Sequence, residues 1–152
     1  MQKMNVERFF LALFMLLFGS CIYILFRSSD LLMFSWFRKI HLYGPISAVR
    51  VQAEPLLNVL PRWFYYSLPN ALWLASGVLF IAVMWEKDKY PFQRNLWIVL
   101  ILSIGFGSEL LQLSSIIPGT FDIKDLLLMI LTLFFIYAFE VANSGYNKGA
   151  YS

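Results

Sequence analysis

Four polar side chains in the C-terminal half of the chain form two pairs, Glu109 with Gln112 and Asp122 with Asp125. Residues three apart lie on one face of a helix, so each pair predicts a polar face. Glu109 stands within an apolar run long enough to cross a bilayer, where an ionised carboxylate costs at least about 2.5 kcal/mol and indicates a functional site. We therefore expect Glu109 and Gln112 to face the interior of a helical bundle, with the two aspartates close to them.

Three kinds of chemistry fit this cluster. The carboxylates and the amide can bind the polar headgroup of an amphiphilic ligand, such as a lipid or a lipid-linked envelope precursor. They can instead hold Mg²⁺ or Ca²⁺, which prefer oxygen ligands, and activate a water or hydroxyl in a membrane-embedded hydrolase or transferase. The third interpretation is interhelical hydrogen bonding, which contributes about 0.6 kcal/mol per contact.

The aspartates also have a purely structural explanation. Asp122 three residues before Asp125 fits an N-cap followed by an acid in the first turn, each stabilising a helix by about 0.3–1 kcal/mol. The sequence contains no Gly-rich phosphate loop, nucleophile-elbow serine, paired His ligands or CxxC motif. We therefore place ligand binding and interhelical hydrogen bonding above catalysis, and we assign no metal or cofactor.

The composition predicts what positions these residues. Of the 152 residues, 60% are hydrophobic and 14% charged, whereas soluble proteins are about 45–50% apolar and about 25% charged. Four apolar windows have roughly the 17–25 residues that a transmembrane helix needs. They are residues 9–26, 63–85, 96–113 and 126–142. We expect one all-α domain over residues 1–152, with four transmembrane helices in an antiparallel bundle.

The long first connection carries a short apolar segment, 31–37, followed by Arg38 and Lys39. Seven residues are too few to span, but tryptophan and basic residues suit the headgroup region, so we predict an interfacial segment. Proline and glycine after it predict an irregular or briefly helical return. His41 is interpreted as an interfacial side chain.

The second window has its own polar face. Pro69 allows the helix to start either near Pro61 or near Ser67. On either side of this proline, side chains recur at helical spacing on one stripe, which we expect to neighbour the Glu109 face. The residues of that stripe are Tyr66, Asn70, Trp73 and Gly77. The predicted ligand-binding residues are Tyr66, Asn70, Glu109, Gln112, Asp122 and Asp125.

Charge bears on location and partners. The Lys and Arg residues divide evenly between the two sides of the bundle. Long loops count little toward orientation, so we favour cytoplasmic termini. A net charge of +3 spread over loops suits a membrane surface better than nucleic acid. Cys21 lies in an apolar run that continues past it, which favours an uncleaved first helix over a lipoprotein signal.

At these four polar positions the sequence resembles the VanZ-like family of small bacterial integral membrane proteins. That family is marked by a Glu and a Gln three apart on one helix, a short turn, and two Asp three apart at the start of the next. Segments 24–27, 67–73 and 117–122 are also similar to a subgroup of small bacterial membrane proteins. The resemblance implies a multi-pass protein of the bacterial inner membrane that acts at the cell envelope. The family takes its name from a member that gives low-level resistance to a glycopeptide antibiotic.

The chain departs from the family pattern at three positions. An Arg usually stands three residues before the first Asp, where this chain has Gly119. An Asn and a Gly of the last helix are replaced by Met129 and Thr132. Without that Arg, we expect Lys124 or a ligand to supply positive charge, or one carboxyl to be protonated.

Overall fold

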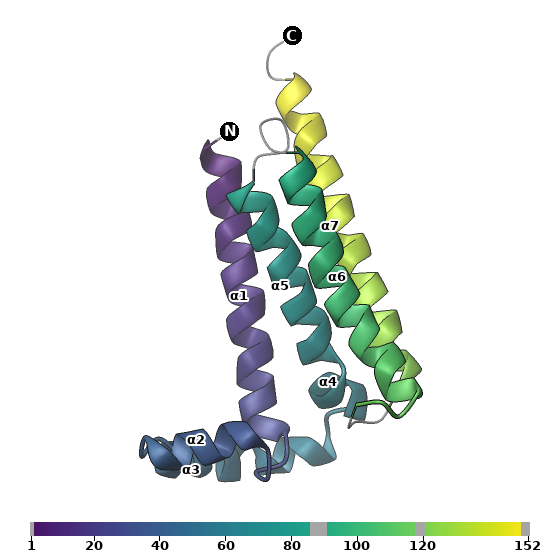
Figure 1. Ribbon diagram of the computed structural model, residues 1–152. Helices are drawn as coiled ribbons and strands as arrows, with labels where there is room; N and C mark the ends of the chain where they lie inside the picture. The colour runs from purple at the N-terminus through teal and green to yellow at the C-terminus, as the bar shows by residue number, and fades with distance from the viewer. Residues whose placement is uncertain (1, 86–90, 118–120, 150–152) are drawn as a thin grey trace.

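A computed structural model describes residues 2–85, 91–117 and 121–149 (Figure 1). Within these ranges every regular element is helical, which confirms the predicted all-α class. The elements are α1 (Gln2–Phe26), α2 (Leu32–Lys39), α3 (Tyr43–Ala53), the 3₁₀ helix η1 (Glu54–Asn58), α4 (Arg62–Tyr66), α5 (Leu68–Met84), α6 (Pro91–Leu113) and α7 (Ile123–Gly149).

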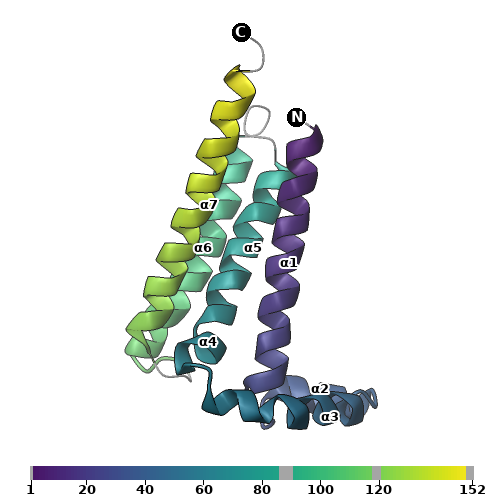
Figure 2. The ribbon, with the colours of Figure 1, turned by 180° about the vertical axis from the view of Figure 1, so that it is seen from behind.

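The four long helices, α1, α5, α6 and α7, lie side by side, and α5 contacts the other three (Figures 1 and 2). The start of α1 and the end of α7 lie at the same end of the bundle. Helices α2 and α3 lie across the opposite end, and we call residues 32–53 the platform. The short helix α4, the end of α6 and the start of α7 lie at the platform end.

Small residues bring α1 and α5 close together. The Ser76 hydroxyl of α5 donates a hydrogen bond of 2.8 Å to the carbonyl of Ala12 in α1, and both residues are buried. A Cβ added at Gly19 would lie 3.0 Å from Nε1 of Trp73 and 3.3 Å from Cβ of Leu72. The Trp73 indole is itself held by a 3.2 Å hydrogen bond to a serine hydroxyl of α1. Such close approach is how apolar helices pack in the absence of a hydrophobic force between them.

Glycines also set the contact between α5 and α6. A Cβ on Gly77 would overlap Ile101, and one on Gly105 would lie 2.9 Å from Cδ1 of Leu74. Leu74 is buried in a cluster that includes Met129 of α7. The three-way contact therefore joins α5, α6 and α7 in one apolar core.

Within the described residues, two helices are long and apolar enough to cross a membrane, Val6–Phe26 of α1 and Pro91–Leu113 of α6. Only 17% and 6% of their most apolar stretches are buried, unlike the core helices of a water-soluble protein. Helix α5, with 17 residues, is a shorter apolar helix. These two candidate spans indicate membrane association, and spanning by all four windows stays a prediction.

Of the two helix starts that Pro69 allows, the start near Ser67 is the one found for α5, and an unbroken helix over 63–85 is wrong because residues 62–66 form the separate helix α4. Pro69 has no N–H to continue the hydrogen-bond ladder, and its ring opposes the carbonyl four residues earlier. The other long helices extend beyond their apolar windows. The window 96–113 is preceded by helix from Pro91 onward, in keeping with the preference of proline for a first helical turn. Likewise α1 begins at Gln2 and α7 at Ile123.

The platform is more ordered than the sequence indicated. The predicted interfacial segment corresponds to α2, which exposes Trp36 and buries Phe34. Of the two forms predicted for the return, irregular or briefly helical, the helical one is found as α3, because Pro45 falls in a first turn where no N–H is needed. His41 joins the two helices with φ 59°, and Leu42 N–H donates to the Phe37 carbonyl over 2.9 Å. His41 thus occupies the left-handed position that ends a helix, where glycine is usual.

Arg50 of α3 anchors the platform to the bundle. Its guanidinium donates to the carbonyl oxygens of Ile24 and Arg27 at the end of α1, the second over 2.6 Å. It also lies 4.7 Å from the ring centroid of Phe34. The last carbonyls of a helix have no partner within the helix, so this one side chain both satisfies α1 and fixes the platform to it.

Replacing Gly19 by leucine tests the α1–α5 contact. Gly19→Leu forces a side chain against Trp73 and Leu72, and overpacking of this kind costs about 1–3 kcal/mol. We expect a lower midpoint of thermal unfolding in detergent. Gly107→Leu is the matched control, because nothing lies within 4 Å of a Cβ at that position. Equal losses in both variants would contradict close packing at Gly19.

Candidate functional site

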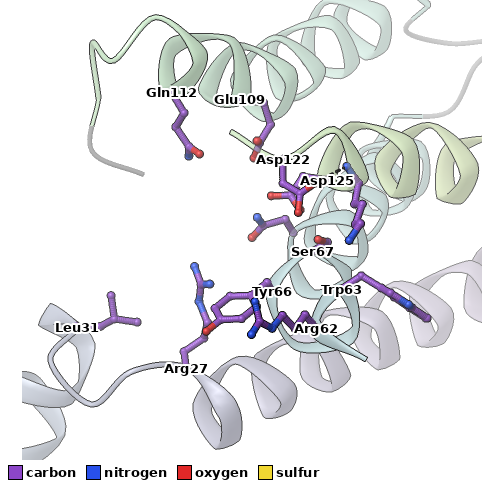
Figure 3. Close-up of a pocket in the computed structure, with 12 residues that line it drawn as sticks. Arg27, Leu31, Arg62, Trp63, Tyr66, Ser67, Glu109, Gln112, Asp122 and Asp125 are labelled. Atoms are coloured by element: carbon purple, nitrogen blue, oxygen red, sulfur yellow. Dashed lines mark hydrogen bonds between the residues drawn. The ribbon is translucent and has the colours of Figure 1, made fainter. Parts of the chain in front are cut away.

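A cavity of about 860 Å³ opens at the platform end of the bundle, among α1, α4, α5, α6 and α7 (Figure 3). All six ligand-binding residues predicted from the sequence line it. The complete lining is Arg27, Leu31, Arg62, Trp63, Tyr66, Ser67, Asn70, Glu109, Gln112, Asp122, Lys124 and Asp125. The cavity is therefore mostly polar and charged.

Helix α6 places Glu109 and Gln112 at the cavity. Glu109 is 1% exposed, and its Oε2 has no hydrogen-bond partner among the described residues. The helix ends one turn later, at Leu113, and Ser115 just beyond it has φ 58°. There Ile116 N–H donates to the carbonyl of Leu111 over 3.0 Å, which completes the hydrogen-bond pattern of a left-handed helix end. The chain then turns back toward α7, so the glutamate and the aspartates come together.

Helix α7 begins on a cap that also lines the cavity. The Oδ1 atom of Asp122 accepts a 2.9 Å hydrogen bond from the backbone N–H of Lys124, as an N-cap does. The structural explanation considered for Asp122 is therefore confirmed. Asp125, one turn further, is 8% exposed, and its Oδ1 lacks a hydrogen-bond partner in the described part of the chain. A cap explains Asp122 but leaves the burial of Asp125 unexplained.

The break between α4 and α5 brings Ser67 to the same place. Ser67 is fully buried, and its Oγ forms no hydrogen bond with any described residue by distance and angle. It nevertheless lies close enough to Asp125 to influence its ionisation. In Figure 3 the side chains of Glu109, Asp122 and Asp125 converge near Ser67. A straight helix across 63–85 would not supply this serine at the break.

The ionisation of Asp125, which precedes the span predicted at 126–142, reflects its surroundings. Burial has the largest effect and raises the pKa of the carboxyl above its usual range. The Ser67 hydroxyl lowers the pKa, the neighbouring Asp122 raises it, and the guanidinium of Arg27 lowers it. The raised pKa means that the ionised form is held at a cost in this fold.

Positive charge comes from residues that the sequence analysis missed. Lys124 lines the cavity as expected, but Arg27 and Arg62 line it as well. The guanidinium of Arg27 lies 5.0 Å from the ring centroid of Tyr66 and 5.3 Å from that of Tyr23. The only sequence signal for Arg27 was its place in the segment 24–27, which resembles one family subgroup.

Two members of the predicted α5 stripe do not reach the cavity. Trp73 packs against α1, where its ring lies 5.0 Å from that of Tyr23, and Gly77 packs against Ile101. The prediction that Trp73 neighbours Glu109 is therefore wrong. Tyr66 and Asn70 lie at the cavity because they stand at the α4–α5 break, at the platform end.

Among the described residues, no group of three or more His, Cys, Asp or Glu is arranged to hold a metal ion. Comparison with family models, with curated proteins and with solved structures finds no match for the chain. The function must therefore be argued from the cavity itself.

Removal of the α7 cap should weaken the fold. Asp122→Ala deletes the acceptor for the Lys124 N–H, which costs about 0.5–2 kcal/mol. Asp122→Ser retains a capping oxygen and should unfold close to the native midpoint in detergent. If both variants lose the same stability, capping is not the structural role of Asp122.

Neutralising Asp125 should change how stability depends on pH. Because burial raises its pKa, ionisation destabilises the fold at neutral pH, and this penalty fades as the pH falls through the folded-state pKa. We expect Asp125→Asn to melt at a higher temperature than the native protein near about pH 7, with the difference shrinking toward about pH 4. A variant that is less stable at neutral pH, or equally stabilised at both pH values, would contradict this.

Proposed function

We propose that the protein is a small multi-pass membrane protein of the bacterial cell envelope whose cavity binds the polar headgroup of an amphiphilic ligand. The observation that carries this proposal is a set of three buried oxygens at the cavity without hydrogen-bond partners among the described residues. They belong to Glu109, Asp125 and Ser67. The ligand is a lipid or a lipid-linked envelope precursor.

An unpaired buried polar group costs about 1–3 kcal/mol, and more when it is charged. Three such groups around one cavity lower the stability of a small bundle considerably. Groups of this kind concentrate where function requires them. Interhelical hydrogen bonding, the third interpretation of the sequence, would pair these oxygens with neighbouring helices. Their unpaired state favours a ligand over a structural role.

The proposed membrane arrangement places the cavity at the level of the lipid headgroups. The spans are the apolar windows within α1, α5, α6 and α7, so that Asp125 lies just outside the last of them, and the platform lies on the membrane surface with Trp36 and Arg38 at the interface. The cavity and the platform occupy the same end of the bundle. With cytoplasmic termini, this end faces outward from the inner membrane, toward the envelope.

The VanZ-like resemblance supports an envelope role. Its four marking residues, Glu109, Gln112, Asp122 and Asp125, all line the cavity, as does Asn70 from the similar segment 67–73. Segments that resemble the family thus meet at one site although they are far apart in the sequence. A membrane-embedded, metal-dependent hydrolase or transferase is the alternative that three carboxylates raise, and no specific observation favours it.

Replacing Glu109 by glutamine tests the proposal. Glu109→Gln keeps the shape of the side chain and removes its charge, so the fold should be retained and a charge-dependent ligand lost. We expect native mass spectrometry of the gently purified protein to find lipid retained by the native chain and absent from Glu109→Gln. Thermal unfolding in detergent should show that the variant remains folded.

The control is Glu54→Gln, which makes the same change at an exposed position outside the cavity. This variant should retain lipid as the native protein does. Lipid retained equally by Glu109→Gln, or by none of the three proteins, would overturn the proposed function.

A further inference from the structure

We propose that the cavity recognises a phosphate ester that carries a primary ammonium group. The phosphate lies against Arg27 and Arg62, and the ammonium lies against Glu109 and Asp125. This inference rests on the proposed function and names the ligand class of the same site. It follows from how the charges are distributed around the cavity.

Except for Lys124 of α7, the charged side chains of the cavity are divided by sign between two sides. Figure 3 shows Glu109, Asp122 and Asp125 on the side formed by α6 and α7, with Arg27 and Arg62 across from them. The two buried carboxylate oxygens lack hydrogen-bond partners among the described residues, so the guanidinium groups do not neutralise them directly. The cavity therefore separates two charged sides instead of joining them in ion pairs.

The basic side is suited to a phosphate. A guanidinium presents a planar fork of N–H donors that matches phosphate oxygens, and two of them can share one group. The rings of Tyr23 and Tyr66 hold the Arg27 guanidinium at 5.3 and 5.0 Å from their centroids. That stacking positions the cation without consuming its N–H donors.

The carboxylates of the acidic side are best matched by a ligand group that donates hydrogen bonds and carries a positive charge. A primary ammonium supplies three N–H donors, which suits the unpaired oxygens of Glu109 and Asp125. A quaternary ammonium has no N–H, and proteins recognise it with aromatic cages. The cavity-lining side chains of α6, of α7 and of its cap are carboxylates, an amide and Lys124, and none of them is an aromatic ring.

A ligand with only one kind of charge leaves one side of the cavity uncompensated. An anionic headgroup would bring a phosphate close to buried carboxylates, whereas a simple amine would leave both arginines without an anion. The volume of about 860 Å³ is within the range of ligand pockets and leaves room for both groups. Only a zwitterion places an anion against the arginines and a cation against the carboxylates.

The test compares lipids that differ in the headgroup alone. Full-length protein in detergent is titrated, by native mass spectrometry, with phosphatidylethanolamine, phosphatidylcholine and phosphatidylglycerol of identical acyl chains. We expect phosphatidylethanolamine to bind at least about tenfold more tightly than the other two, because hydrogen bonds between charged groups contribute on that scale. Addition of soluble phosphoethanolamine then shows whether the protein recognises the headgroup alone or a headgroup carried by a lipid. Displacement of the lipid supports recognition of the headgroup alone, and persistence of the lipid supports a lipid-borne headgroup held also by its chains.

Variants of the protein test which side of the cavity binds the ammonium and which side binds the phosphate. Glu109→Gln should reduce the preference for phosphatidylethanolamine over phosphatidylglycerol to about onefold, because it removes a charged acceptor. Arg62→Gln, at an exposed position, should weaken all three phosphate-bearing lipids, and Glu54→Gln should leave the preference unchanged. Phosphatidylglycerol or phosphatidylcholine binding as tightly as phosphatidylethanolamine to the native protein would overturn this inference and leave the proposed function standing. Binding of none of the three lipids would overturn both.

Discussion

The close approach of α1 to α5 is the contact on which the rest of the structure depends. Helix α5 is the central helix, and α1 reaches it only because Ala12, Gly19 and Ser76 leave its backbone accessible. This contact brings the end of α1, which carries Arg27, to the start of α5, where the chain breaks at Ser67. The basic side of the cavity is thus placed by residues buried far from it. Between apolar helices such packing stands in for the hydrophobic force available in water.

The burial of two carboxylates in the bundle costs free energy and offsets part of the stability that this packing provides. Glu109 and Asp125 are nearly inaccessible, yet each keeps an oxygen without a hydrogen bond to any described residue. The bundle must therefore hold these groups against their tendency to be hydrated. Small residues at the contacts of α5 with α1 and α6 make the bundle tight enough to do so. These two carboxylates consequently lower the stability of the bundle and, in the proposed function, bind the ligand.

The local sequence pattern predicted the acidic side of the cavity and missed the basic side. Spacing by three placed Glu109 and Gln112 on one face, and the acids at the start of the next helix followed from capping, so local rules were sufficient for α6 and α7. Arg27 enters the cavity through the α1–α5 contact, which no spacing along the chain reveals. Periodicity also assigned Trp73 to the wrong neighbour, because a stripe on α5 is shared between α1 and α6 and only packing decides which helix it meets. A helix start near Ser67 was one of the two that Pro69 allowed, but the local sequence could not choose between it and a start near Pro61.

The capping of α1 by Arg50 connects the platform to the cavity. One guanidinium binds the carbonyl of Arg27, the residue whose side chain lines the cavity, and lies on Phe34 of α2. In the proposed arrangement the platform rests on the bilayer surface, so a force that moves the platform also acts, through Arg50, on the backbone of the residue that lines the cavity. Ligand binding at the cavity and displacement of the platform are then reciprocally coupled. In the proposed arrangement, the headgroup site is therefore sensitive to the mechanical state of the membrane from which it draws its ligand.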